Sequence, residues 1–389
     1  MDDQNYERTN LDVSREELLK GAVDCLGFRC EVDRIDKHVA VSGLYDLDGN
    51  LVSEGAGKGP SCNLGAIAEA IEHYCLQNER RSDFCTYSSE FLLSQSSLQK
   101  DGVIRSLSSF DGFLQCVEFT EVFGEEQVVI PKILVSPEEE LPKSPCDLFL
   151  HRYSTNSGSA FGCTLNEALL HGVNEVVERH VLSLVMLDSV GVSAGLTVIE
   201  LPGGIVEDFF PSLDFELGDV TRIYYVPNVF SSFFCLAIRG RQAGEFLLPQ
   251  LGAGCSQSFS LALSRAIFEL KQVESLYAYE ERLVDEQAIR IIERSKRLEG
   301  LRLIFPPSAR SSNEMPPLVS VDEQQPERQL ERVIESLKVH GYKVYYRVVR
   351  EINEYSFVTQ VYIPGLERFN LIRSGKWVAP QEALLKSLC

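Results

Sequence analysis

Pairs of glutamates spaced three residues apart recur in otherwise apolar helical stretches of this sequence. Glu69 and Glu72 stand in AIAEAIEHY, and Glu175 and Glu178 stand in GVNEVVERH. Residues three or four apart share one face of a helix, and a carboxylate on a largely apolar helix is costly to bury unless it meets a cation or a metal ion. Hard oxygen ligands of this kind suit Mg²⁺, which commonly brings phosphate oxygens with it.

A third stretch, RAIFELKQ, carries a related pattern. Glu269 follows Arg265 by four residues and precedes Gln272 by three. Every one of these glutamates also has a simpler interpretation as a solvated or helix-capping side chain. Glu167 in particular fits a capping box with Thr164.

A glycine-rich segment precedes each of the three stretches. The segments read EGAGKGPS, STNSGSAFGCT and LGAGCSQS. Glycine lets a backbone approach a ligand closely and expose N–H groups to phosphate. The first segment is not a Walker A motif, because Val52 stands where its first glycine should be and Gly59 replaces its Ser or Thr. Taken alone, each segment could be a simple turn.

Composition restricts the class of protein. The 389 residues are 44% hydrophobic and 24% charged, which is ordinary for a soluble globular protein. A net charge of −20 argues against a nucleic-acid surface, which needs a basic field. No stretch is long enough to cross a bilayer, and the eleven cysteines show neither a CxxC pair nor zinc-finger spacing with histidine. We expect a cytoplasmic protein with reduced thiols and no contact with nucleic acid or membrane.

The elements that position these residues alternate irregularly along the chain, which predicts an α+β fold. Apolar periodicity predicts helices at 15–25, 63–79, 164–187, 258–283 and 328–341. Alternation predicts a hairpin in 38–55 and strands at 114–123, 126–135, 221–230, 233–240, 342–349 and 356–365. We divide the chain into an N-terminal helix and hairpin region, 1–50, and a catalytic domain, 51–389.

The combination of these segments resembles the YcaO family. Three segments carry the match: GAGKGPSCNLGAIAEAIEHY, STNSGSAFGCTLNEALLHGVNEVVERH and LGAGCSQSFSLALSRAIFELKQ. A weaker fourth match is VYIPGLE, and the whole pattern spans residues 50–370. In this family the glutamate-bearing helices line one nucleotide site and hold magnesium against the phosphates of ATP.

The resemblance implies a role for ten residues of this chain. The implied magnesium ligands are Glu69, Glu72, Glu175, Glu178 and Glu269. The implied residues that stabilise phosphate charge are Arg179 and Arg265. The implied nucleotide contacts, direct or through one intervening group, are Lys58, Glu167 and Gln272.

The sequence departs from the family pattern at three places. His73 stands where the first helix should carry an arginine, and Cys163 replaces an expected asparagine. The C-terminus KWVAPQEALLKSLC contains Pro380 alone, whereas azoline-forming members often end in a proline-rich tail. The resemblance therefore gives this terminus no catalytic role.

The resemblance implies ATP- and Mg²⁺-dependent activation of peptide backbone amides by O-phosphorylation. Cyclodehydration of Cys, Ser or Thr in a ribosomal precursor peptide would give azolines, the precursors of thiazoles and oxazoles. One alternative is thioamide formation from an external sulfide, and another is a non-catalytic adaptor that binds ATP or a leader peptide. We expect a homodimer and a separate leader-binding or TfuA-like partner protein, because the first 50 residues are too few for a leader-binding module.

Overall fold

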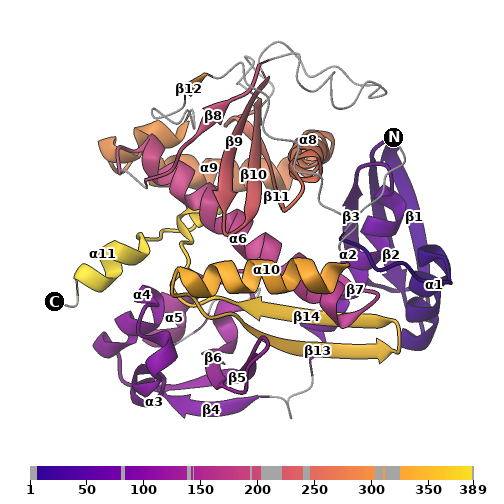
Figure 1. Ribbon diagram of the computed structural model, residues 1–389, viewed down its shortest axis with the longest axis horizontal. Helices are drawn as coiled ribbons and strands as arrows, with labels where there is room; N and C mark the ends of the chain where they lie inside the picture. Colours follow the sequence, from indigo (N-terminus) through magenta and orange to yellow (C-terminus); the bar gives the residue numbers. More distant parts are fainter. Residues whose placement is uncertain are drawn as a thin grey trace. The chain divides into compact units, whose positions relative to one another are not determined.

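The computed structural model describes residues 7–79, 84–137, 142, 144–192, 195–202, 221–239, 246–302, 310–311 and 325–387. Contacts divide the chain into two compact units. Unit 1 comprises Met1–Val176, Glu323–Arg368 and Val378–Cys389, and unit 2 comprises Val177–Asp322 and Phe369–Trp377. Both units combine helices with mainly antiparallel strands, which confirms the predicted α+β class (Figure 1).

Unit 1 contains two antiparallel sheets, of three strands in the order β1-β2-β3 and of six strands in the order β4-β5-β13-β14-β7, with β6 also paired to β5. The strands are β1 (Arg29–Asp36), β2 (Val39–Tyr45), β3 (Leu51–Lys58), β4 (Cys85–Ser88), β5 (Phe113–Glu121), β6 (Gln127–Pro131), β7 (Ser159–Gly162), β13 (Tyr345–Asn353) and β14 (Ser356–Tyr362). The helices are α1 (Arg15–Leu26), α2 (Cys62–Gln77), α3 (Ser89–Ser94), α4 (Gly102–Arg105), α5 (Pro145–His151), α10 (Pro326–Val339) and α11 (Gln381–Lys386).

Helix α2 packs against both sheets of unit 1. It contacts β2 and β3 of the smaller sheet and β7 and β13 of the larger one (Figure 1). Its apolar side supplies Ala70, Ile71 and Cys75 to a core that also contains Leu44 of β2 and Val358 of β14. The glutamate-bearing side of the helix is thereby held in a fixed rotation.

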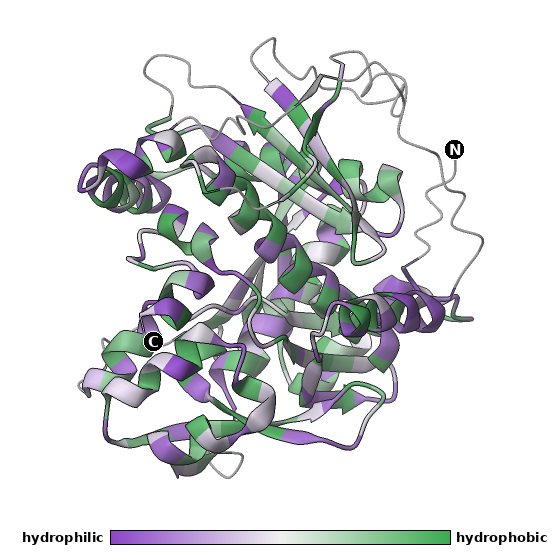
Figure 2. Ribbon diagram, turned by 60° about the vertical axis from the view of Figure 1, so that its left-hand side comes forward, coloured by the Kyte–Doolittle hydropathy of each residue, from purple (hydrophilic) through white to green (hydrophobic). Residues whose placement is uncertain are grey.

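Unit 2 contains a five-stranded sheet in the order β11-β10-β9-β8-β12. The strands are β8 (Ile199–Glu200), β9 (Thr221–Val229), β10 (Ser232–Arg239), β11 (Gln250–Ser256) and β12 (Arg310–Ser311), and the helices are α8 (Phe259–Leu276) and α9 (Tyr279–Ile292). Strands β10 and β11 are almost wholly buried, and Figure 2 shows the hydropathy of the residues along the chain. Helix α8 covers β10 and β11 through Ala262, Leu263 and Ala266.

The long helix α6 (Leu165–Ser189) belongs to both units, since residues up to Val176 pack in unit 1 and the following residues pack in unit 2. Its bounds agree with the helix predicted at 164–187. The helix predicted at 258–283 is instead two helices, α8 and α9, with Tyr277 and Ala278 extended between them. Tyr277 donates its hydroxyl to Asp285 at 3.0 Å and packs edge-on against Phe246, so side-chain contacts favour the break.

The glycines of the three glycine-rich segments explain how these strands approach helices. A Cβ on Gly57 of β3 would overlap the Cys62 carbonyl oxygen at the start of α2, and one on Gly254 of β11 would overlap the Ala262 carbonyl of α8. A Cβ on Gly162 of β7 would similarly meet the α6 backbone. These glycines therefore allow a strand to pack closely on a helix. This reason differs from the close approach of the backbone to phosphate that is expected from the sequence.

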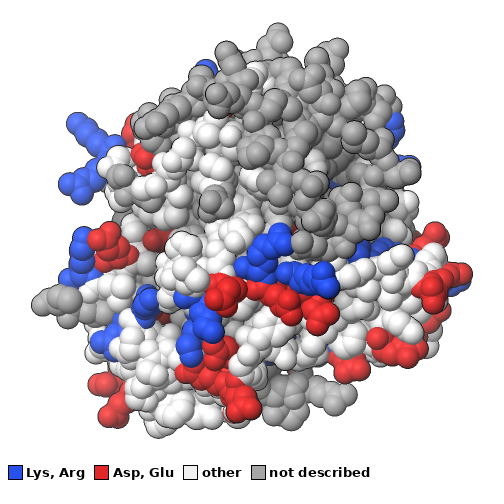
Figure 3. Space-filling view, viewed as in Figure 1, with Lys and Arg blue, Asp and Glu red and all other residues white. Residues whose placement is uncertain are grey.

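Two further observations concern the charged side chains on the surface and the length of the helices. On the face shown in Figure 3, the described acidic and basic side chains lie interspersed. No helix in the described parts of the chain combines the length and the apolar character that a membrane span requires.

Candidate nucleotide site

Helix α2 carries the first glutamate pair beside strand β3. Glu69 accepts a hydrogen bond through Oε2 from the backbone N–H of Ala56 at 2.9 Å. His73 donates from Nδ1 to the Glu54 carbonyl at 2.8 Å, since a carbonyl can only accept, and its Nε2 lies 3.8 Å from Glu69 Oε1. His73 thus stands next to Glu69 at the position where the family pattern has an arginine.

Two carboxylates of unit 1, Glu69 and Glu175, act on a third, Glu72. Protein atoms crowd the Glu72 carboxyl although part of the residue reaches solvent. This burial raises the pKa of Glu72 well above its usual range, with further increases from the charges of Glu175 and Glu69. A backbone hydrogen bond from Phe161 acts in the opposite direction and is outweighed. A bound cation would favour the ionised form of Glu72, so one or two of these carboxylates could serve a divalent metal ion.

The second half of α6 and helix α8 form a separate charged cluster in unit 2. Arg179 lies between two carboxylates, with Nη1 3.6 Å from Glu178 Oε1 and Nη2 3.5 Å from Glu269 Oε1. The side chains of Glu178 and Glu269 are only 10% and 14% exposed. Arg265, one turn before Glu269, donates from Nη1 to the Cys255 carbonyl at 2.8 Å, which ties α8 to the end of β11.

The three predicted nucleotide contacts differ in their surroundings. Lys58 is the last residue of β3 and is half-buried. Gln272 is half-buried on α8, seven residues after Arg265 and therefore on the same side of that helix. Glu167 is fully buried near the start of α6.

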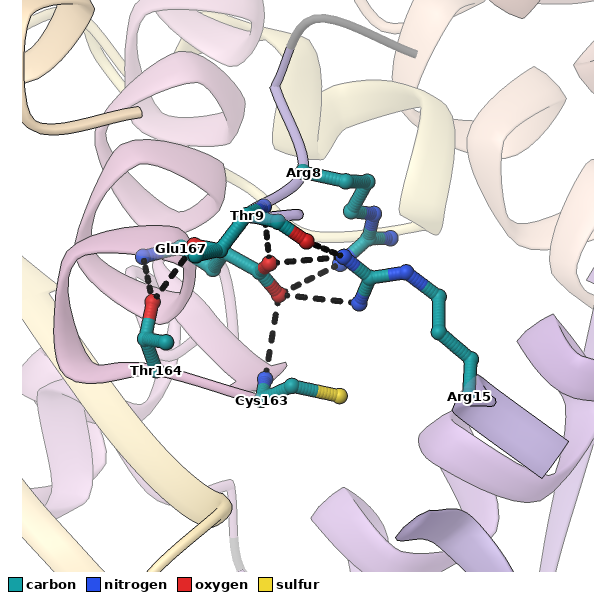
Figure 4. Close-up of polar contacts among 6 residues, drawn as sticks. All are labelled: Arg8, Thr9, Arg15, Cys163, Thr164 and Glu167. Atoms are coloured by element: carbon teal, nitrogen blue, oxygen red, sulfur yellow. Dashed lines mark hydrogen bonds and ion pairs between the residues drawn. The ribbon is translucent and has the colours of Figure 1, made fainter. Parts of the chain in front are cut away.

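The contacts of Glu167 modify the predicted capping box. Thr164 Oγ1 accepts from the Glu167 N–H at 3.3 Å, as predicted, but the Glu167 carboxylate accepts from the Cys163 N–H at 3.1 Å (Figure 4). The same carboxylate receives two hydrogen bonds from Arg15, at 2.8 and 3.1 Å. Burial alone would raise the pKa of Glu167, but the hydrogen bond from Arg15 and the positive charges of Arg8 and Arg15 lower it overall.

The ten predicted residues are divided equally between the two units. Unit 1 contains Lys58, Glu69, Glu72, Glu167 and Glu175, and unit 2 contains Glu178, Arg179, Arg265, Glu269 and Gln272. Within the described ranges, no three His, Cys, Asp or Glu side chains form a group that could hold a metal ion by themselves. Mg²⁺ commonly takes one or two protein carboxylates and completes its shell with phosphate oxygens and water.

Sequence reasoning missed the residues that contact Glu167. Thr9 and Arg15 lie more than 150 positions away in the chain, and no local spacing connects them to α6. The available signal was indirect: a carboxylate buried in a helix requires a cation partner, and the N-terminal segment contains two arginines, Arg8 and Arg15.

Comparisons with known proteins identify the fold and the family. Residues 56–367 match the family model of the YcaO cyclodehydratases, described as ATP- and Mg²⁺-binding. A YcaO structure from Methanopyrus kandleri bound with AMPPCP and Mg²⁺ superposes with a TM-score of 0.63 and 18% identity, over 96% of both chains. No curated protein matches the sequence.

Two further solved structures share the fold. A heterocyclase in complex with substrate and cofactor has a TM-score of 0.58 and 16% identity, over 94% of this chain and 55% of the heterocyclase. The microcin synthetase McbBCD complex of E. coli has a TM-score of 0.52 and 17% identity, over 86% of both chains.

Proposed function

The chain belongs to the YcaO family, whose cofactors are ATP and Mg²⁺, and we propose that it phosphorylates backbone amide oxygens of a ribosomal precursor peptide. Cyclodehydration of Cys, Ser or Thr would then give azoline heterocycles. The observation that supports this proposal best is the setting of Glu72, where burial and then the charges of Glu175 and Glu69 disfavour ionisation, so that a bound cation would stabilise the carboxylate. We further propose that the enzyme works as a homodimer with a separate leader-binding or TfuA-like protein.

The glutamates would bind the metal ion, and the arginines would stabilise the charge of the phosphates. Glu69, Glu72, Glu175, Glu178 and Glu269 would hold Mg²⁺, which supplies charge neutralisation to the phosphates of ATP. Arg179 already lies between two carboxylates, so an arriving metal ion would let its guanidinium turn toward the transferred phosphoryl group. Arg265 would add positive charge from α8, while Lys58 and Gln272 would contact the nucleotide.

The reaction needs no nucleophile from the protein. The side-chain thiol or hydroxyl of the substrate adds to the carbonyl carbon of the preceding residue, and the amide oxygen attacks the γ-phosphorus of ATP. ADP leaves, and expulsion of phosphate carrying the former amide oxygen gives the azoline. The peptide loses the amide oxygen to phosphate and two protons, one from the thiol or hydroxyl and one from the amide nitrogen, which is a net loss of one water. Phosphorylation makes the expulsion possible because it converts a poor leaving group into a good one.

One feature favours thioamide formation as a second candidate. The helix α11 is anchored within unit 1, where Gln381 accepts from the Gly102 N–H at 2.6 Å and donates to the Leu366 carbonyl at 3.1 Å. In such an enzyme an external sulfide would replace the amide oxygen, and the terminus would be peripheral to the reaction.

Co-expression with the peptides and partners encoded next to the gene tests the proposal by mass spectrometry. A loss of about one water mass per site indicates azolines, and a gain of the sulfur-for-oxygen difference indicates thioamides. Co-expression of Glu175→Gln should give an unmodified peptide. An unmodified peptide with the unaltered enzyme and every flanking partner would contradict both chemistries and favour the adaptor.

A further inference from the structure

The N-terminal strap, which we define as residues 7–15, lies against the first three turns of α6. Its contacts with Glu167 are drawn in Figure 4. The Glu167 carboxylate accepts from the Thr9 N–H and twice from the Arg15 guanidinium, at 2.8 and 3.1 Å, and the Arg8 guanidinium lies 3.7 Å away. A fourth hydrogen bond comes from the Cys163 N–H at 3.1 Å. The Glu167 side chain is fully buried under these groups.

These bonds exhaust what a carboxylate can accept. An ionised carboxylate has two oxygens with about four lone-pair sites. Four hydrogen bonds from Thr9, Arg15 and Cys163 fill those sites on Glu167, and Arg8 adds a further positive charge. A nucleotide or a magnesium ion could reach Glu167 only by displacing the strap.

The strap follows the side of α6 that leads to the predicted metal ligands. Thr9 Oγ1 lies 3.1 Å from Thr164 Oγ1, and further along the helix Glu7 Oε1 accepts from Asn174 Nδ2 at 3.2 Å. Glu167 and Asn174 are seven residues apart and therefore on the same face, and Glu175 is the next residue. Arg15 also donates to the Thr9 carbonyl at 2.9 Å, so it holds the strap and Glu167 together.

We infer that Glu167 is a positioning residue that fixes the strap along α6, which excludes the direct form of the nucleotide contact implied by the resemblance. This inference rests on the proposed function only in one respect: the strap contacts Asn174, the residue before Glu175, so its attachment should affect nucleotide affinity. Glu167 and Arg15 then act as one unit, and loss of either detaches the strap.

Hydrogen exchange of the Thr9 amide tests the anchor without any nucleotide. In the unaltered protein this amide should be protected, because it donates to a buried carboxylate. Glu167→Gln and Arg15→Gln should each accelerate its exchange by at least about tenfold. Arg15→Lys, which keeps the charge but loses the paired geometry, should give a smaller acceleration. Lys20→Gln, at an exposed position of α1, is the matched control and should change nothing.

Nucleotide affinity, measured by calorimetry on the same proteins, separates positioning from contact. Both glutamine variants should weaken Mg-ATP binding by a similar factor, about five- to tenfold, and the double variant should be no weaker than the worse single variant. A large loss for Glu167→Gln with no loss for Arg15→Gln, or an unprotected Thr9 amide in the unaltered protein, would overturn the inference. If even the unaltered protein and Lys20→Gln bind no nucleotide, the proposed function fails while the exchange result still decides the anchor.

Discussion

Individual carboxylates of the candidate site lie in two different electrostatic settings. Glu72 lies near Glu175 and Glu69, and burial together with their charges raises its pKa. Glu178 and Glu269 share Arg179, at 3.6 and 3.5 Å, so the guanidinium compensates their charge. In the first setting burial and neighbouring negative charges disfavour ionisation of Glu72, whereas in the second a guanidinium lies beside both carboxylates, and these settings predict different results for substitutions.

Glu178→Gln should strongly reduce ATP turnover and preserve the fold. The substitution removes one charge from a carboxylate that is 10% exposed but keeps its shape. Since the contribution of a metal ion to phosphoryl transfer is worth several kcal/mol, we expect turnover to fall by about two orders of magnitude. Phosphate release and circular dichroism measure the two effects.

Glu280→Gln is the matched control for this substitution. Glu280 is an exposed glutamate in the first turn of α9, also in unit 2, and its variant should keep full turnover. If Glu178→Gln unfolds instead of losing turnover, Glu178 has a structural role.

His180 should make stability depend on pH. Burial lowers the pKa of His180 to about 4, so the folded protein binds its proton less readily than the unfolded chain, with a usual value of 6.5. The contribution of His180 to the free energy of unfolding is therefore fully present above pH 6.5 and is lost as the pH falls toward 4. Between pH 7 and pH 5 the loss should be about 2 kcal/mol.

Urea unfolding of His180→Phe at several pH values measures how much of the pH dependence of the unfolding free energy comes from His180. Phenylalanine retains the ring that stacks on Phe230 but cannot take up a proton. The difference in unfolding free energy between pH 7 and pH 5 should shrink by about 2 kcal/mol in this variant. A pH dependence of unfolding free energy in His180→Phe equal to that of the unaltered protein would contradict the assignment to His180.

At the scale of elements, each chemistry-bearing helix packs on a strand whose glycines permit backbone contact. In each case a charged side chain of the helix also bonds the backbone of the preceding segment: Glu69 to Ala56, Glu175 to Gly158, and Arg265 to Cys255. The glycines set the distance and these bonds set the rotation of the helix. Together they explain why glycine-rich segments precede helices that bear carboxylates.

Gly57→Ala should therefore cost more than about 3 kcal/mol of unfolding free energy, because its Cβ would overlap the backbone of α2 at Cys62 and Ala66. Gly21→Ala is the matched control. Gly21 is a residue of α1 with no atom within 4 Å of its added Cβ, so the substitution should stabilise by about 0.5–1 kcal/mol. Urea unfolding measures both, and a well-tolerated Gly57→Ala would contradict the packing argument.

Deletion of residues 386–389 distinguishes two roles of the C-terminus. Lys386 and Ser387 are exposed, and the buried anchors Gln381 and Leu384 remain, so stability should change by less than about 1 kcal/mol. In a thioamide former with a peripheral terminus, turnover should also persist. Loss of turnover at unchanged ATP affinity would instead place the terminus in the chemistry of an azoline former.

At the scale of the molecule, the sequence predicts elements better than their contacts. Helices α2 and α6 were predicted to within two residues because their apolar positions repeat with helical period. The break between α8 and α9 was missed, because Tyr277 and Asp285 determine it by contact. The Glu167–Arg15 pair was missed because folding alone brings residues 152 positions apart together. The proposed ligand roles and the boundary at residue 50 stay predictions.

Calorimetric titration with ATP, in the presence of Mg²⁺ and then of EDTA, tests the central claim most directly. We expect saturable binding that weakens by at least about tenfold without Mg²⁺ in the unaltered protein and in Glu280→Gln. Glu175→Gln should lose this magnesium dependence, because it removes a charge from the cluster that would hold the ion. Two results would contradict a magnesium–nucleotide site on the glutamate-bearing helices. One is tight ATP binding whose affinity changes neither with removal of Mg²⁺ nor with Glu175→Gln, and the other is no ATP binding even with substrate peptide present.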